Sequence, residues 1–199
     1  MEKLSTELKK RIGLLRRLRY KLPRNRLRIV AEALFNSKLR YGAAVYLKPI
    51  FESEELKAEH LPGETRILQT LQNDMLRAIY GYSREQHVNM KKLRENIKMM
   101  SVNQIAVYHT IIETYNVVVK DSSKQLKEKM LPEQDRYFLR STENGDLKIP
   151  IKPKSSCTGF TYFGPKIWKE LPKQIKEAKS YSSFKQKVKS WVWETIPPY

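Results

Sequence analysis

The sequence contains few of the residues from which covalent cross-links and metal sites are built. Its 199 residues include one cysteine and three histidines. Because Cys157 is alone, a disulfide within the chain and a cysteine-rich zinc site are both excluded. The histidines, His60, His87 and His109, lack the spacing of metal ligands, so we expect surface or helix-packing roles for them.

Residues for catalysis are also scarce. The four aspartates, Asp74, Asp121, Asp135 and Asp146, are scattered, whereas two-metal phosphoryl transfer needs clustered carboxylates. The chain has no glycine-rich phosphate loop of the Walker or dinucleotide type and no Gly-x-Ser-x-Gly nucleophile elbow. We therefore expect none of these catalytic centres, no cofactor and no metal, and a carboxylate cluster assembled by the fold is the alternative.

Long hydrophobic runs are missing as well. The apolar run from Gly42 to Leu47 is far shorter than the ~20 residues of a membrane span, and the N-terminus lacks the apolar core of a signal peptide. Hydrophobic residues still make up 40% of the chain, which is enough for a folded core. We expect a soluble intracellular protein, nuclear or cytoplasmic, without a membrane span.

Positive charge is abundant and unevenly distributed. The formal net charge is +18. Residues 1–48 hold 14 Lys and Arg against 3 Asp and Glu, residues 49–135 hold 12 against 13, and residues 136–199 hold 13 against 5. Two basic ends that flank a neutral middle favour a polyanionic partner, with nucleic acid first and an anionic membrane surface second. An ordinary solvated basic surface is the alternative interpretation.

Hydrophobic spacing predicts a mainly α-helical protein. A first helix is expected over residues 2–20, Pro23 then breaks the chain, and a second helix starts near Asn25. Gly81 has the position of a C-cap, and Ser101-x-x-Gln104 has the pattern of a capping box that opens the clearest helix. The residues predicted to face inward are Leu27, Val30, Leu34 and Tyr41, then Ile67, Leu71, Met75 and Ile79, then Ile105, Tyr108, Ile112, Tyr115 and Val119.

The pattern of the sequence changes from helical spacing to short runs and turn residues after residue 131. A turn at Asn144-Gly145-Asp146 between two short runs predicts a β-hairpin over about residues 137–151. Two short helices are expected after it, the last with Phe184, Val188, Trp191 and Val192 on one face.

The fold class expected from these patterns is mainly α. A helical bundle occupies residues 1–131, and a small α+β C-terminal subdomain with the hairpin and two short helices occupies residues 132–199.

Several short motifs follow one another in a fixed order. The segment LLRRLRYKLPRNRLRIVAEALFNSKLRYGAAVYL comes first, RILQTLQNDMLRAIYG follows, and SVNQIAVYHTIIETYNVVV comes next. The chain closes with Gly164-Pro165, Ile167-Trp168, Leu171-Pro172, Ile175-Lys176, Ser183-Phe184-Lys185 and Trp191. This succession, from about residue 8 to residue 193, resembles the C-terminal region of the reverse transcriptase of non-LTR (LINE-type, jockey-like) retrotransposons.

The resemblance implies a polymerase thumb followed by a C-terminal extension. Such proteins carry an upstream palm with an aromatic-x-Asp-Asp metal loop, and this sequence has no such loop. It therefore implies a non-catalytic fragment of an RNA-directed DNA polymerase, either a truncated copy or a separately encoded remnant. The implied partners are nucleic acid, as RNA or an RNA–DNA duplex bound independently of sequence, and the reverse transcriptase palm in the full-length element.

A thumb grips the phosphate backbone, and arginine suits phosphate oxygens. The residues predicted to bind nucleic acid are Arg16, Arg17, Arg19, Lys21, Arg24, Arg26, Arg28, Lys38, Arg40, Lys185 and Lys189. The alternative is that the arginines are solvated or pair with the acidic stretch from Glu52 to Glu59.

Two other functions stay open at this point. A helical protein-interaction module would leave the apolar residues of the first helix exposed, and an inactive remnant would have no independent activity. Binding to an anionic membrane would require a broad apolar face on the same helix.

Overall fold

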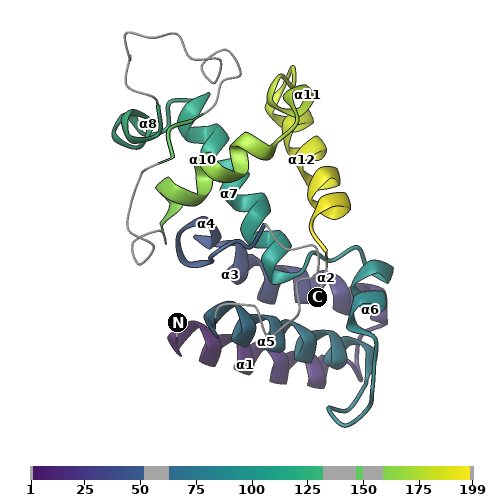
Figure 1. The fold of residues 1–199 in the computed structure, drawn as a ribbon. Helices are drawn as coiled ribbons and strands as arrows, with labels where there is room; N and C mark the ends of the chain where they lie inside the picture. Colours follow the sequence, from purple (N-terminus) through teal and green to yellow (C-terminus); the bar gives the residue numbers. More distant parts are fainter. Residues whose placement is uncertain (1, 52–62, 132–146, 150–158, 198–199) are drawn as a thin grey trace, which may run out of the picture. The chain divides into compact units, whose positions relative to one another are not determined.

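The computed structural model describes residues 2–51, 63–131, 147–149 and 159–197 (Figure 1). The described part of the chain is mainly helical and contains no strand, which confirms the predicted helical character. The elements are α1 (Glu2–Leu18), α2 (Arg24–Ala31), the π-helical segment η1 (Glu32–Asn36), α3 (Ser37–Arg40), α4 (Ala43–Tyr46), α5 (Gly63–Tyr80), α6 (Met90–Asn96), α7 (Val102–Val118), α8 (Lys124–Met130), α10 (Phe160–Glu170), α11 (Lys173–Lys176) and α12 (Tyr181–Thr195).

Three predictions fall on residues outside the described ones. Nearly all of the hairpin expected over residues 137–151 lies there, and the three described residues 147–149 form no strand. Cys157 and the acidic stretch from Glu52 to Glu59 lie there too.

The chain forms two compact units. The first contains Met1–Ala43, Glu52–Ile105 and Pro197–Tyr199, and the second contains Ala44–Phe51 and Ala106–Ile196. The domain boundary expected between residues 131 and 132 stays a prediction.

In the first unit, α1 and α5 lie side by side (Figure 1). Leu8, Ile12 and Leu15 of α1 are buried, as their spacing predicts. Full burial of one such side chain stabilises a fold by ~1.5–3 kcal/mol. The apolar stripe of the first helix is therefore part of the core of this unit.

The second helix is interrupted by a π-helical turn, which the sequence pattern does not predict. Its buried apolar residues are Leu27, Ala31, Phe35 and Leu39. These residues are four positions apart, whereas a regular α-helix has about 3.6 residues per turn, so their side chains would gradually rotate away from one face. The wider π-helical turn at η1 compensates for this rotation and keeps them on one side.

The inward position predicted for Tyr41 is wrong, because 84% of this residue is exposed. Tyr41 has left the helix, with φ −64° and ψ 110°. Gly42 follows it with φ 70°, a conformation that favours glycine.

Helix α5 buries Leu68, Leu71, Met75 and Ile79, but Ile67 is 53% exposed, so its predicted inward position is wrong. The predicted C-cap is confirmed. Gly81 has φ 85°, and the backbone N–H groups of Gly81 and Tyr82 both donate to the carbonyl of Arg77, at 2.8 and 3.0 Å. This is a glycine-ended helix stop of the usual left-handed type.

The capping box of α7 is confirmed. The backbone N–H of Ser101 donates to Oε1 of Gln104 at 2.9 Å, and the backbone N–H of Gln104 donates to Oγ of Ser101 at 3.2 Å. Of the residues predicted to face inward from α7, Ile105, Ile112 and Tyr115 are buried. Val119 lies just beyond the helix and is 50% exposed, so its inward position is wrong.

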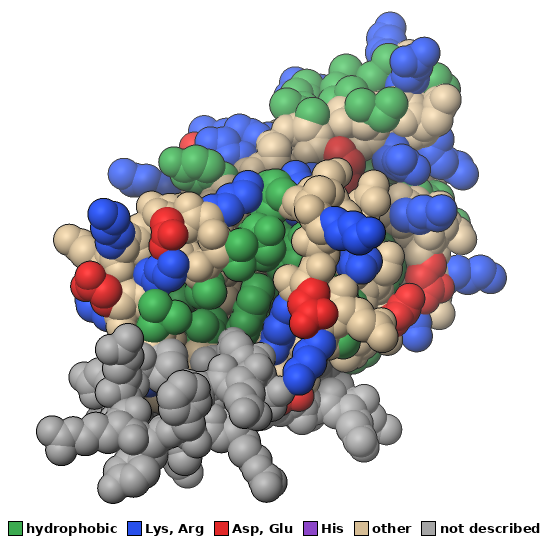
Figure 2. Space-filling view, turned by 90° about the horizontal axis from the view of Figure 1, so that it is seen from above, with side chains coloured by type: hydrophobic (Ala, Val, Ile, Leu, Met, Phe, Trp, Pro, Cys, Tyr) green, Lys and Arg blue, Asp and Glu red, His purple; other side chains and the backbone are tan. Residues whose placement is uncertain are grey.

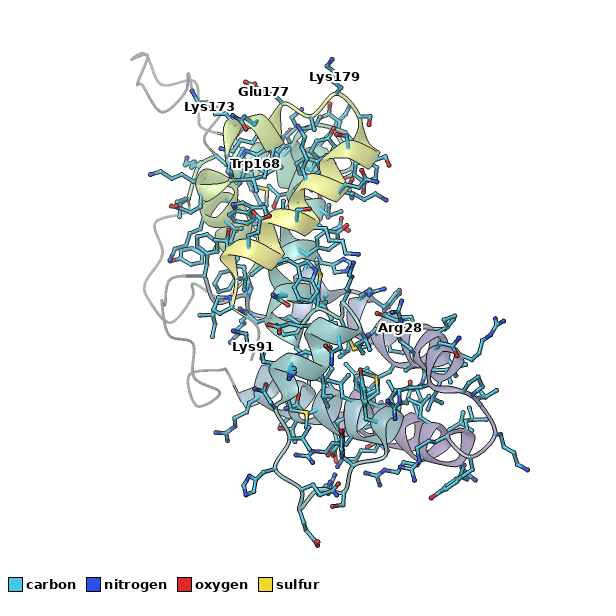
Figure 3. The ribbon with its side chains drawn as sticks, turned by 90° about the vertical axis from the view of Figure 1, so that its right-hand side faces the viewer. Arg28, Lys91, Trp168, Lys173, Glu177 and Lys179 are labelled. Atoms are coloured by element: carbon cyan, nitrogen blue, oxygen red, sulfur yellow. The ribbon has the colours of Figure 1, made fainter. Side chains whose placement is uncertain are left out.

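The second unit has an aromatic core. The rings of Tyr115 and Phe184 stack with centroids 4.1 Å apart, and Trp168 lies 6.2 Å from Phe184. Phe184, Val188 and Val192 of α12 are buried together, as predicted. Trp168 lies within this unit, whereas Lys173, Glu177 and Lys179 project at its end (Figure 3).

Candidate nucleic-acid interface

The end of α1, the turn after it and the start of α2 form a corner rich in cations, which we call the basic corner (residues 16–28). It holds seven Lys and Arg and no Asp or Glu. These are Arg16, Arg17, Arg19, Lys21, Arg24, Arg26 and Arg28. The first unit thus brings seven of the eleven predicted site residues together at one place.

The corner is built by a few local features. Helix α1 ends at Leu18, whose carbonyl accepts hydrogen bonds from the backbone N–H groups of Lys21 and Leu22, both at 2.9 Å. Pro23 then occupies the N-cap of α2 in an extended conformation, with φ −65° and ψ 154°. The buried side chain of Leu27 anchors the first turns of α2 to the core.

The cations of the basic corner are available to solvent. Six of them are exposed and Arg19 is partly exposed. Among the described residues, none of the seven forms an ion pair. Like charges gathered without carboxylates produce a positive potential that an anion relieves. Figure 2 shows Lys and Arg side chains spread over the visible face among fewer Asp and Glu side chains.

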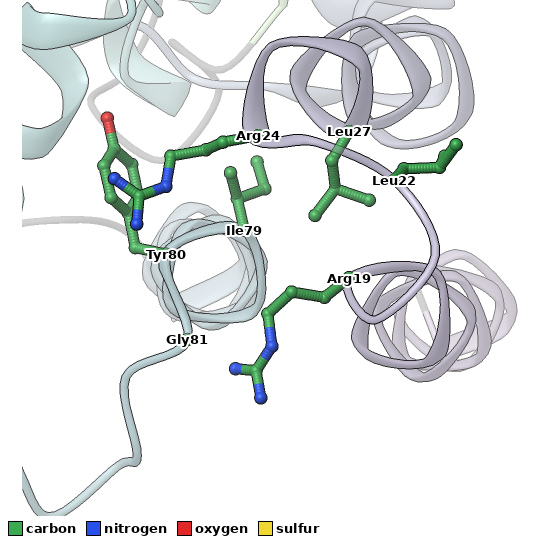
Figure 4. Close-up of a pocket in the computed structure, with 7 residues that line it drawn as sticks. All are labelled: Arg19, Leu22, Arg24, Leu27, Ile79, Tyr80 and Gly81. Carbon is green, nitrogen blue, oxygen red and sulfur yellow. The ribbon is translucent and has the colours of Figure 1, made fainter.

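A pocket of about 500 Å³ opens between the basic corner and the end of α5 (Figure 4). It is lined by Arg19, Leu22, Arg24, Leu27, Ile79, Tyr80 and Gly81. Leucine and isoleucine side chains form its apolar part, and two guanidinium groups supply its charge. Its size is within the range of small-ligand pockets.

The two arginines of the pocket each lie against a tyrosine ring. The guanidinium carbon of Arg24 is 5.0 Å from the centroid of Tyr80, and that of Arg19 is 4.8 Å from the centroid of Tyr20. Nη2 of Arg19 also donates to the hydroxyl of Tyr20 at 2.9 Å. Tyr82 lies almost parallel to Tyr80, with centroids 6.2 Å apart and an interplanar angle of 13°.

Burial raises the pKa of the Tyr80 phenol, and the positive charges of Arg24 and Arg28 oppose this increase. Tyr80 is therefore a neutral ring at physiological pH, with a hydroxyl that donates and accepts hydrogen bonds. The prediction from the sequence missed Tyr20, Tyr80 and Tyr82. Two signals in the sequence could have indicated them. Tyr20 directly follows Arg19, and the C-cap at Gly81 places Tyr80 at the end of a helix.

Lys38 and Arg40 lie elsewhere and have carboxylate partners. Lys38 follows Arg24 by 14 residues along a nearly continuous helical run, which separates them by roughly 20 Å. Its Nζ lies 3.6 Å from Glu7, and Nη2 of Arg40 lies 3.0 Å from Glu32. The structure does not join these two residues to the basic corner.

Lys185 and Lys189 belong to α12 in the second unit, and both are exposed. Nζ of Lys185 lies 4.8 Å from the centroid of Tyr181, and Nζ of Lys120 lies 3.3 Å from the same centroid. Two ammonium groups thus share one ring on this unit. This arrangement stabilises the surface of α12 by cation–π attraction.

A buried polar cluster joins α5, α6 and the start of α7 in the first unit. Nε2 of Gln69 donates to Gln72 and Asn73, at 3.0 and 3.1 Å, and the backbone N–H of Val102 donates to Oε1 of Gln69 at 2.9 Å. Nη1 of Arg94 donates to Oδ1 of Asn73 at 2.8 Å. The polar residues Gln69, Gln72 and Asn73 of the segment RILQTLQNDMLRAIYG are thus explained by packing within the unit.

Arg94 is the unusual member of this cluster. Its side chain is fully buried, and its Nε and Nη2 have no hydrogen-bond partner among the residues that the structure describes. Burial lowers the pKa of Arg94 to about 10, with the neighbouring charge of Glu95 opposing the shift. A buried guanidinium with unpaired donors opposes folding.

The described residues offer no cluster of side chains for a metal ion. No group of three or more His, Cys, Asp or Glu among them could hold a metal ion. Asp74 is engaged by Arg84, whose Nε and Nη2 both donate to its carboxylate. In the same part of the chain, no helix is long and apolar enough to cross a membrane.

Comparison with protein-family models, with curated proteins and with solved structures finds no match to this chain.

Proposed function

We propose that this protein binds nucleic acid through its phosphate backbone, with the basic corner as the principal contact surface. The observation that carries the proposal is the set of seven cations in residues 16–28 that form no ion pair among the described residues. Arginine forks and lysine ammonium groups bind phosphate oxygens irrespective of the base sequence. The binding is sequence-independent, and the protein itself carries out no reaction.

The motif order along the chain supports a more specific origin for this activity. It resembles the thumb and post-thumb region of a LINE-type reverse transcriptase, and a thumb holds the template–primer backbone. The proposed role is a non-catalytic C-terminal part of such an RNA-directed DNA polymerase. In the full-length element its further partner is the palm domain.

The burial of the first helix favours nucleic acid over the two other candidate functions. A protein-interaction module or a membrane-binding helix would use the apolar stripe of that helix. Leu8 and Leu15 are fully buried and Ile12 is 4% exposed, so the apolar stripe of α1 is covered, and Leu14 is its one large apolar side chain classed as exposed, at 38%.

The test is the salt dependence of binding to a labelled oligonucleotide. If the corner neutralises ~5 phosphates, log K falls with log salt with a slope of roughly −4 to −5. Affinity then drops several hundredfold between ~50 and ~200 mM salt. A nearly flat response would refute the proposal, and sedimentation with anionic liposomes without oligonucleotide binding would assign the charge to a membrane instead.

A further inference from the structure

The basic corner contains more than charge, because flat aromatic rings lie beside its arginines. Tyr20 is 78% exposed and Tyr82 is 40% exposed. A tyrosine that is mainly in solvent contributes little to a core, since its apolar surface stays in water. Exposed tyrosines at a cationic surface are instead typical of binding sites, where the ring offers a large rigid contact.

The fold places Tyr80 in the wall of the pocket, and Tyr20 and Tyr82 each follow a lining residue, Arg19 and Gly81. Tyr20 follows Arg19 in the turn after α1, and Tyr80 is the last residue of α5. The left-handed conformation of Gly81 turns the chain back so that Tyr82 lies nearly parallel to Tyr80, at 13°. Tyr80 and the guanidinium groups of Arg19 and Arg24 therefore line one opening of about 500 Å³, and Tyr20 and Tyr82 pack against two of these lining side chains.

This combination of groups matches an unpaired nucleotide. Bases in a duplex stack on one another and offer only their edges, whereas the face of an unpaired base is open to an aromatic ring. Surfaces for single strands combine a positive groove that follows the backbone with rings on which bases stack. Nothing in the pocket selects one base, because every base has such a face.

We propose that the pocket receives an unpaired nucleotide of a single-stranded nucleic acid, with its base against the tyrosine rings and its phosphate at Arg19 and Arg24. This deepens the proposed function and rests on it, since it names the strand form that the basic corner prefers. The surface then holds single strands more tightly than duplexes of the same length.

A purely structural role for the tyrosines is the competing explanation. The contact of Arg24 with Tyr80, at 5.0 Å, ties α2 to α5. Tyr20 and Tyr82 serve better for the test, because both are substantially exposed. Tyr41 is a matched control, since it is 84% exposed and follows the far end of the helical run that begins at Arg24.

The experiment measures the affinity of the full chain for four probes at one salt concentration: oligo-dT, oligo-rU, and DNA and RNA duplexes of the same length. The variants are the double substitution Tyr20→Leu/Tyr82→Leu, the double substitution Tyr20→Phe/Tyr82→Phe and the single Tyr41→Leu. Circular dichroism and thermal melting establish that each variant is folded. A 2-aminopurine base in the single strands reports stacking through its fluorescence.

The expected result is a preference of the parent protein for single strands, lost in the leucine variant and kept in the phenylalanine and Tyr41→Leu variants. Loss of one base–ring stack weakens binding roughly tenfold or more. The two single strands distinguish RNA from DNA as the preferred form.

Equal binding of duplex and single strand, with the leucine variant unchanged, would overturn the inference while leaving phosphate binding intact. Equal weakening by the leucine and phenylalanine variants would assign the effect to the hydroxyls and would also overturn it. Absence of salt-dependent binding to all four probes would remove the proposed function itself.

Discussion

A side chain at Gly81 would collide with Arg19: a Cβ at this position would lie 2.8 Å from Nη1 of the arginine. Gly81 also has φ 85°, which costs an L-residue ~1–2 kcal/mol. We therefore expect Gly81→Ala to lower the free energy of unfolding by about 1–2 kcal/mol or more and to displace Arg19 from the pocket. Urea unfolding measures the first effect and oligonucleotide affinity the second.

Gly13 provides the opposite case within the same unit. It lies inside α1, and a Cβ there would meet nothing within 4 Å. Gly13→Ala should raise the free energy of unfolding by about 0.5–1 kcal/mol, because alanine restricts the unfolded chain and favours the helix. Equal effects of the two substitutions would contradict the left-handed cap.

Arg94 is expected to oppose the fold that contains it. Replacement of Arg94 by methionine removes a buried charge and two donors without a partner in the described part of the chain, while Oδ1 of Asn73 keeps its hydrogen bond from Gln69. We expect Arg94→Met to raise the free energy of unfolding by about 1–3 kcal/mol. Lys91→Met, an exposed substitution on the same helix with the same loss of charge, should change it little.

The pH dependence of the stability gained by Arg94→Met follows from the direction in which burial shifts the pKa of Arg94. The pKa of Arg94 is lowered to about 10 in the folded state, so the unfolded chain holds the proton more tightly. The penalty is complete below about pH 10 and declines only as the pH rises above it. The gain from Arg94→Met should therefore be constant between about pH 6 and 9, and a destabilised variant would mean that the guanidinium has an anionic partner in solution.

The position of a charge, and not only its number, should control binding. Arg16→Ala/Arg17→Ala/Arg19→Ala removes three cations at the basic corner, and Lys3→Ala/Lys9→Ala/Lys10→Ala removes three exposed cations from the other part of α1. The first variant should weaken binding to oligonucleotides of every sequence alike and reduce the magnitude of the salt slope by about 3. The second variant should change the affinity and the salt slope less. Equal losses in the two variants would mean that binding depends on the total charge of the protein and not on the basic corner.

The capping box of α7 should show measurable coupling. Each of Ser101 and Gln104 satisfies a backbone N–H of the other, at 3.2 and 2.9 Å. Ser101→Ala should cost about 0.5–2 kcal/mol, and Ser101→Ala/Gln104→Ala should cost less than the two single substitutions added together. Ser180 caps α12 and has no glutamine or glutamate at the third position, so Ser180→Ala measures a cap alone. Strict additivity for Ser101 and Gln104 would contradict the reciprocal bonds.

Local signals predicted the parts of this fold that depend on neighbouring residues. The stop at Gly81 and the start at Ser101 depend on side chains and backbone within a few positions, so the sequence was sufficient. The buried face of α12 at Phe184, Val188 and Val192 also follows from simple periodicity.

Features that depend on contacts between distant residues were not predictable in the same way. The π turn over Glu32–Asn36 changes the register that an α-helical period assumes, and it moved the buried positions to Phe35 and Leu39. Gln69 and Gln72 resemble surface residues in the sequence and become buried because they bond to Val102 and Met100. The seven cations of the basic corner are close in the sequence, so the sequence alone could group them. Tyr80 is distant from them in the sequence, and its role at the pocket depends on the packing of α5 against the corner.

The absence of carboxylates from residues 16–28 has a consequence for the protein alone in solution. Mutual repulsion among these cations works against the compact state, and dissolved ions shorten its reach to about 10 Å at 0.1 M ionic strength. Moderate concentrations of a simple salt should thus raise the melting temperature of the free protein. The same salt should weaken the binding of a polyanion, so the conditions that stabilise the free chain oppose formation of its complex.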